Sequence, residues 1–183
     1  MEFSISPILT GAPEAPRCAV ETAAFALLDR LGISYTRVEH PPADTAEVRA
    51  AVNRALDIRI CKNLFLCNRQ QTDFYLLCMP EDKPFRTSEV SRQIGSSRLS
   101  FAPPEQMEAL LGCTPGSASV LGLMCDTEHR VRLLLDREVA ESEWFGCHPC
   151  KNDGSLKLRT RDILEVFLPS TGHAPAVVDL SGE

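Results

Sequence analysis

The sequence predicts one α/β domain built around a sheet. Two observations support this class: stretches with helical and with strand periodicity alternate along the chain, and no linker, repeat or low-complexity segment separates them. The chain has 183 residues, of which 44% are hydrophobic, enough for a folded core without a metal or disulfide. We expect a single domain over residues 1–183, with residues 1–13 as a loosely packed lead-in.

Residues 16–31 are predicted to form the first helix. From Val20 onward, apolar residues recur at spacings of three and four, which is the period of a helix with one buried face. Pro16 suits the first helical position, and Gly32 suits the residue just past the end.

A short strand and a second helix follow. Residues 33–38 alternate between apolar and polar side chains, as in a half-buried strand. After a proline-containing break, a helix is predicted to run to residue 56. Asp44 is its expected N-cap, because Glu47 lies three residues later in the pattern of a capping box.

The remaining predicted elements alternate in the same way. They are strands at 63–67 and 73–79 joined as a hairpin, helices at 88–94 and 104–111 closed by Gly95 and Gly112, strands at 131–135 and 155–159, a helix at 162–167 and a strand at 176–180. The strand at 131–135 is mainly apolar, which suits a buried position.

Charge and hydropathy exclude several classes of protein. The net charge is −6, with −3 in residues 1–58, −4 in residues 162–183 and +1 in residues 59–161. Strong non-specific binding to nucleic acid needs many phosphate contacts, so it is not expected. The apolar run from Phe74 to Met79 is far shorter than the roughly 20 residues of a membrane span, and the first residues lack a secretory signal pattern.

Eight cysteines without a secretory signal indicate a reducing compartment, so we expect a cytoplasmic protein. Only Cys147 and Cys150 have a spacing that chemistry uses. This pair could be a redox dithiol, half of a zinc site or two incidental buried thiols. The turn-forming residues after the pair argue against the redox dithiol, and the lack of a second Cys-x-x-Cys argues against the zinc site.

Lys62 and His148 each have a structural and a functional interpretation. Lys62 precedes an apolar strand, where a lysine often extends its charge into solvent. His148 lies between Gly146 and Pro149, in a segment that must bend, where a histidine often bonds a carbonyl group. Bends near sheet ends also collect functional side chains, so neither residue decides between the two interpretations alone.

Seven ordered blocks together resemble the YbaK/ProX family over roughly residues 20 to 180, most closely its ProX branch. They are Lys62-Asn-Leu-Phe-Leu66, Arg98-Leu-Ser-Phe-Ala102, Leu111-Gly-x-Thr-Pro-Gly-Ser117, Leu121-Gly-Leu123, Val131-x-Leu-Leu-Leu-Asp136, His148-Pro-x-x-Asn152 and Thr171-Gly-His173, with His40-Pro-Pro42 and Thr45 also matching.

The resemblance implies an α/β domain with a central mixed β-sheet flanked by helices. It implies a trans-editing deacylase that hydrolyses the ester of mischarged tRNA(Pro), most of all alanyl-tRNA(Pro). The implied partner is the acceptor end of tRNA(Pro), with prolyl-tRNA synthetase as a second candidate. No cofactor, metal or membrane is implied.

The same resemblance places the site. Its functional lysine falls on Lys62, and its Gly-His-Pro segment falls on Cys147, His148 and Pro149. We therefore expect Lys62 and His148 to be the catalytic residues. Since an ammonium group is a poor general base, Lys62 is expected to hold a phosphate or ribose of the terminal adenosine, and His148 to orient the substrate or the attacking water. The expected substrate-binding residues are Asn63, Thr45, Gly116, Ser117 and Cys147, with backbone N–H groups near Gly116 or Cys147 facing the oxyanion.

One departure leaves the choice of amino acid open. The family loop often continues Val-Ser-Pro-Phe-Gly, whereas residues 118–122 here read Ala-Ser-Val-Leu-Gly. Deacylation of Cys-tRNA(Pro) is therefore an alternative to deacylation of alanyl-tRNA(Pro). Two further hypotheses stay open. The chain could be a non-catalytic module that binds tRNA or the synthetase, or a redox protein that uses Cys147 and Cys150.

The charge distribution predicts weak, salt-sensitive binding to tRNA. A protein that contacts only an acceptor end makes few phosphate contacts, and each contributes about −0.7 to −0.9 to the slope of log K against log salt. Filter binding or fluorescence titration over a range of salt concentrations measures this slope. A slope steeper than about −5, which corresponds to many phosphate contacts, would contradict the expectation.

Overall fold

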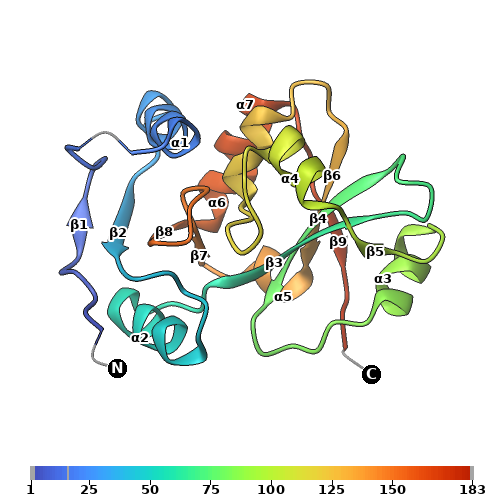
Figure 1. The fold of residues 1–183 in the computed structure, drawn as a ribbon, viewed down its shortest axis with the longest axis horizontal. Coiled ribbons are helices and arrows are strands. Elements are labelled where there is room, and N and C mark those ends of the chain that lie inside the picture. Colours follow the sequence, from blue (N-terminus) through green and yellow to red (C-terminus); the bar gives the residue numbers. More distant parts are fainter. Residues whose placement is uncertain (1–2, 16, 182–183) are drawn as a thin grey trace.

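The computed structural model describes residues 3–15 and 17–181 and shows a mixed α/β domain with two sheets (Figure 1). The predicted class is confirmed. Pro16, the expected first residue of the first helix, lies outside the described residues, as do residues 1–2 and 182–183.

The strands of the described residues are short to medium in length. They are β1 (Leu9–Thr10), β2 (Tyr35–Glu39), β3 (Cys61–Cys67), β4 (Phe74–Pro80), β5 (Ser100–Phe101), β6 (Val131–Asp136), β7 (Trp144–Cys147), β8 (Gly154–Arg159) and β9 (Ala176–Val178).

The helices lie between these strands. They are α1 (Ala19–Arg30), α2 (Ala46–Leu56), α3 (Thr87–Ile94), α4 (Pro104–Leu111), the 3-10 helix η1 (Val120–Cys125), α5 (Arg137–Glu141), α6 (Thr160–Asp162), the π-helical turn η2 (Ile163–Phe167) and α7 (Leu168–Thr171).

The strands form one antiparallel and one mixed sheet. The four-stranded sheet has the order β1-β2-β8-β7, with each neighbouring pair antiparallel. The five-stranded sheet has the order β5-β3-β4-β6-β9, in which β4-β6 and β6-β9 are parallel. The expected mixed sheet is therefore present, and a separate antiparallel sheet lies beside it. In Figure 1, β1 and β2 lie on one side of the molecule with α1 and α2, and the mixed sheet lies on the other.

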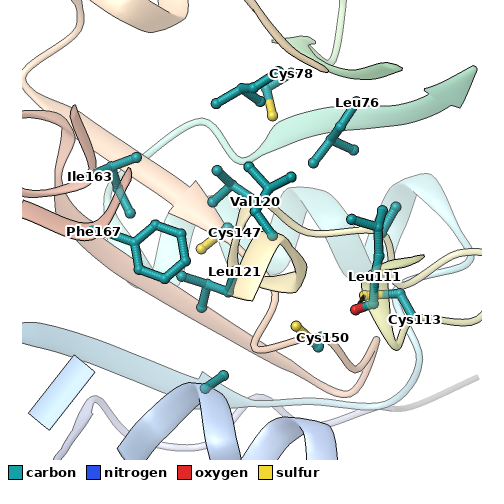
Figure 2. Packing of buried hydrophobic residues seen from close by; sticks show 14 of the residues in the cluster. Leu76, Cys78, Leu111, Cys113, Val120, Leu121, Cys147, Cys150, Ile163 and Phe167 are labelled. Atoms are coloured by element: carbon teal, nitrogen blue, oxygen red, sulfur yellow. Dashed lines mark hydrogen bonds between the residues drawn. The ribbon is translucent and has the colours of Figure 1, made fainter. Parts of the chain in front are cut away.

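Strand β4 is buried along its whole length, because both faces of the mixed sheet are covered. Its alternate residues face two different cores, as the period of a strand requires. Leu76 and Cys78 face the larger core with η1 and the segment from 160 to 171. Leu77 and Met79 face the smaller core under α3. Figure 2 shows part of the larger core around Val120.

A third apolar cluster joins α2 to the antiparallel sheet. Val48, Val52 and Leu56 lie on one face of α2 at spacings of four, and they pack against Val38 of β2. This contact places the N-terminus of α2 beside the connection from β2, where the site described below is found.

Most predicted elements are confirmed within two to three residues, including the hairpin of β3 and β4. Gly32, Gly95 and Gly112 adopt the left-handed conformation just past their helices, as expected. The predicted cap of the second helix is wrong by one residue. Thr45 is the N-cap of α2, and its hydroxyl accepts a hydrogen bond from the Val48 N–H.

The C-terminal half shows two further differences. The segment containing Cys147 is a strand, β7, up to that residue, because its backbone pairs with β8. The predicted helix at 162–167 is the centre of a longer helical segment that runs from Thr160 to Thr171 and includes a π-helical turn. Near the other end of the chain, the lead-in that was expected to be loosely packed forms an edge strand, β1, against β2.

The close packing of η1 against α4 predicts a large effect at Gly122. A Cβ atom there would lie 2.7 Å from the Leu111 carbonyl oxygen, a backbone atom that cannot move aside cheaply. We expect Gly122→Ala to lower the free energy of unfolding by about 2 kcal/mol in urea denaturation. Gly154→Ala is the matched control, since its Cβ would meet nothing closer than 3.6 Å. Equal stabilities of the two variants would contradict this packing.

Candidate active site

A cavity of about 800 Å³ lies where the two sheets meet. Its walls come from β3, from the loop before η1, from the start of α2 and from the loop that joins β7 to β8. The residues that matter for its chemistry are Lys62, Asn63, Gly116, His148 and Asn152. Four of the seven predicted site residues, Lys62, Asn63, Gly116 and His148, therefore line one cavity.

His148 follows the last residue of β7 and is fixed by its own loop. Its Nδ1 lies 2.8 Å from the Gly154 carbonyl oxygen. Because a carbonyl only accepts, Nδ1 carries the proton, and the neutral ring keeps its lone pair on Nε2. Burial lowers the pKa of His148, and the nearby His40 adds to this effect. The neutral, basic form of His148 is thus favoured near pH 7.

The loop that carries His148 is attached to the connection between β2 and α2. The His40 and Ala43 N–H groups each donate to its backbone, to the carbonyls of residues 153 and 152, at 3.1 Å. The Asn152 Nδ2 donates to the Asp44 carboxylate at 2.8 Å. Two segments that are about 110 residues apart in the sequence are therefore held together as one wall of the cavity.

Lys62 lies at the start of β3. Its Nζ donates to the Lys83 carbonyl oxygen at 2.7 Å. An ammonium group has three donors, so this bond orients Lys62 and leaves two N–H groups for other acceptors. Arg49, the other cation of the wall, forms an ion pair with Glu81 and donates to the Asp44 carbonyl.

Asn63 connects β3 to the loop before η1. Its Nδ2 donates to the Ala118 carbonyl oxygen at 3.0 Å, which fixes the orientation of the amide. Its Oδ1 is buried and has no hydrogen-bond partner among the residues that the structure describes. Such an acceptor is costly to leave unpaired, so it suits a site that a ligand donor completes.

Gly116 and Ser117 form a tight turn at the edge of the cavity. Gly116 has a φ of +87°, a conformation that glycine adopts without strain. The Ser117 hydroxyl donates to the Thr114 carbonyl and accepts from the Thr114 N–H. Ser117 is buried beneath the turn and does not line the cavity, so it holds Gly116 in position.

Two other predicted substrate-binding residues also lie outside the cavity lining. Thr45 caps α2 and is exposed. Cys147 is fully buried, and its side chain points into the larger core (Figure 2). Their direct role in binding stays a prediction that the geometry does not favour.

The structure adds residues that the sequence patterns did not place in the site. His40 and Ser155 lie behind His148, and Ser155 lines the cavity. Phe101, which is 65% exposed, forms part of the rim and packs against Phe85. The His-Pro-Pro sequence at 40–42 was a usable signal for His40. Nothing in the sequence distinguishes Ser155 from other serines.

The geometry of Cys147 and Cys150 does not suit a redox dithiol. Both side chains are buried. Burial raises the pKa of Cys147, and a hydrogen bond with the Cys113 thiol together with burial raises that of Cys150. A reactive thiol needs access and a lowered pKa. Within residues 3–15 and 17–181, no group of three or more His, Cys, Asp or Glu side chains is placed to hold a metal ion.

Comparison with known proteins assigns the family of this chain. A family model described as the aminoacyl-tRNA editing domain matches residues 40–166. The chain therefore belongs to the aminoacyl-tRNA editing domain family. Both predicted catalytic residues, Lys62 and His148, lie within the matched range.

Particular relatives confirm the resemblance to the YbaK/ProX family. The chain is 33% identical over 153 residues to the prolyl-tRNA synthetase associated domain-containing protein 1 of Danio rerio, covering 82% of each chain. It is 29% identical to the prolyl-tRNA editing protein ProX of Acetoanaerobium sticklandii, covering 86% of this chain and 96% of that protein. A solved structure described as a candidate trans-editing enzyme for prolyl-tRNA synthetase has the same fold, with a TM-score of 0.63 at 17% identity, covering 90% of this chain and 99% of that one.

None of the helices among the described residues is long and apolar enough to cross a membrane.

The burial of Cys147 and Cys150 predicts slow reaction with a disulfide reagent such as DTNB. At pH 8 in the native protein, we expect both to react at least about a hundredfold more slowly than the exposed Cys18, because little thiolate forms and access is blocked. Mass spectrometry of peptides after timed labelling measures each rate. Labelling of either buried thiol as fast as Cys18 would restore the redox interpretation.

Proposed function

We propose that this protein hydrolyses the ester bond between a wrong amino acid and the terminal adenosine of tRNA(Pro), with alanyl-tRNA(Pro) as the substrate. The observation that carries this proposal is that the Nδ1-protonated His148 and the oriented Lys62 line the same cavity. The relatives named for prolyl-tRNA editing support it.

His148 acts as the general base. Its Nε2 takes a proton from water while the water oxygen adds to the ester carbonyl carbon, giving a tetrahedral intermediate. The bond between that carbon and the ribose oxygen then breaks, and the proton passes from Nε2 to the departing hydroxyl group. The products are the free amino acid and uncharged tRNA. No step needs a covalent enzyme intermediate.

Lys62 binds an oxygen of the ribose or of the phosphate that precedes it. Its two remaining N–H donors are directed by the bond to the Lys83 carbonyl, so the charge is positioned before the substrate arrives. The backbone at Gly116, where the absence of a side chain allows close approach, is the candidate to face the oxyanion.

The aminoacyl and adenine groups have separate candidate contacts. The unpaired Oδ1 of Asn63 accepts a hydrogen bond from the α-ammonium group of the amino acid. The exposed ring of Phe101 at the rim offers a face on which the terminal base stacks, an interaction that contributes about 1–3 kcal/mol in other proteins.

Selection between amino acids is a question of size in this proposal. A rigid wall excludes an amino acid with a larger side chain by steric overlap. It discriminates less strongly against an amino acid with a smaller side chain, which only loses some contacts. The wall residue Ala118 is held by Asn63 through its carbonyl oxygen, which makes this part of the wall rigid. We propose that it admits alanine and excludes the proline ring. In this proposal the partners are the acceptor end of tRNA(Pro) and prolyl-tRNA synthetase.

The test is a deacylation panel with alanyl-, cysteinyl-, seryl- and prolyl-tRNA(Pro). We expect the fastest release from alanyl-tRNA(Pro), and a loss of about 10²–10³ in kcat/KM for both Lys62→Ala and His148→Ala.

The pH dependence of kcat/KM tests the role of His148 as the base. Because the pKa of His148 is lowered, the imidazole stays neutral to a lower pH than usual. As the pH is lowered, kcat/KM is therefore expected to fall only below about pH 6.5, where His148 becomes protonated.

Lys83→Met is the matched control for Lys62→Ala, since Lys83 presents only its backbone carbonyl to Lys62 and its ammonium binds Asp136 and Glu138 elsewhere. It should keep most of the activity. Binding of tRNA without hydrolysis of any of the four substrates would favour the non-catalytic module, and fastest release of cysteine would favour the alternative substrate.

A further inference from the structure

We infer that His40 is a positioning residue, which acts through the Ser155 hydroxyl to support the Nδ1–H tautomer of His148 that the Gly154 carbonyl also favours. This inference concerns how the base of the proposed function is held and rests on that function for its catalytic consequence. The hydrogen-bond arrangement itself is testable without any substrate.

Three side chains from different parts of the chain form the arrangement. The Nε2 of His40 lies 2.8 Å from the Ser155 Oγ, and the same Oγ lies 3.3 Å from the Nδ1 of His148. On its other edge, the Nδ1 of His40 lies 2.7 Å from the Pro41 carbonyl oxygen. His40 and Ser155 are 6% and 0% exposed, so water does not take their place.

The carbonyl groups at the two ends determine where the protons lie. The Pro41 carbonyl only accepts, so the Nδ1 of His40 carries its proton, and the Nε2 of the neutral ring must accept. The hydroxyl group of Ser155 therefore donates to His40. Its oxygen then presents a lone pair toward His148, whose Nδ1–H is shared between this oxygen and the Gly154 carbonyl.

His40 thus controls the direction of a hydroxyl group that could otherwise turn around. Without an acceptor at the position of the His40 Nε2, the buried Ser155 hydroxyl needs another partner, and the Nδ1 of His148 is 3.3 Å away. If the hydroxyl donated there, it would oppose the bond from the Nδ1–H of His148 to the Gly154 carbonyl. A fraction of His148 would then carry its proton on Nε2 instead, where a donor replaces the lone pair. A general base requires the opposite arrangement.

The arrangement also supports the charged form of His148. When Nε2 takes a proton, both nitrogens of the ring are donors, and the Nδ1–H already has two oxygen acceptors, from Gly154 and Ser155. No carboxylate is hydrogen-bonded to either ring among the described residues. The serine oxygen and the carbonyl groups therefore take the orienting role that an aspartate has in a catalytic triad.

Two substitutions of His40 separate positioning from packing. In His40→Gln, the amide can donate to the Pro41 carbonyl and accept from Ser155, as the imidazole does. In His40→Phe, the volume is retained but both polar atoms are lost. Imidazole ¹⁵N chemical shifts of His148 report its tautomer, and steady-state deacylation of alanyl-tRNA(Pro) reports kcat and KM.

We expect wild type and His40→Gln to show the Nδ1–H tautomer of His148. In His40→Phe, a substantial fraction of the Nε2–H tautomer should appear, with kcat reduced about tenfold and KM within about twofold. In the double variant His40→Phe, Ser155→Ala, the hydroxyl that turns around is absent. The Nδ1–H tautomer and most of kcat should return, which a packing defect would not allow.

His173→Phe is the control, because His173 is also buried and hydrogen-bonded, to Asp126 and Thr171, but does not line the cavity. It should lower stability without moving the His148 shifts. An Nε2–H tautomer in wild-type His148 or His40 overturns the inference whether or not any variant folds. So does a His40→Phe protein with unchanged tautomer and kcat. If the wild-type protein hydrolyses none of the esters, the proposed function fails. The imidazole ¹⁵N shifts still test the hydrogen-bond arrangement of His40, Ser155 and His148.

Discussion

The site depends on the antiparallel pairing of β2 with β8. These strands pair in a register that places Val38 opposite Ser155 and Glu39 opposite Gly154, and the hydrogen bonds continue beyond the strands to residues 40 and 43. A shift of one residue would turn every side chain to the other face. His40, Ser155 and His148 meet only in this register, so backbone hydrogen bonds determine the position of the proposed base.

The remaining architecture supplies the other wall. Strand β4 is buried on both faces and anchors β3, which carries Lys62 and Asn63 to the edge of the mixed sheet. The salt bridge of Arg49 with Glu81 then connects α2 to the segment after β4. Cavity residues from both sheets are therefore held by main-chain pairing and a few polar contacts. A preorganised site of this kind loses little binding energy to rearrangement.

Patterns of single elements could be predicted from the sequence, and arrangements between elements could not. The apolar period of α1 and the glycines after three helices identify those helices, since these are local signals. Asp44 was predicted as the N-cap of α2, but Thr45, an equally suitable residue type, takes that position. Strand β7 was missed because its pairing with β8 is a tertiary contact. For the same reason, ordered motifs could predict that Lys62 and His148 share a site, whereas the place of Ser155 in the cavity is visible only in three dimensions.

The contact between Asn63 and the Ala118 carbonyl has a consequence for how such a protein changes during evolution. This bond links a strand of the cavity to a segment that continues directly into Val120 and Leu121, which are fully buried in the larger core. The width of the wall is therefore coupled to the volume of side chains that no substrate touches. Under the proposed function, a substitution deep in the core can alter the accepted amino acid while every residue that lines the cavity is kept. Sequence comparison of lining residues alone would then assign the same substrate to proteins that discriminate differently.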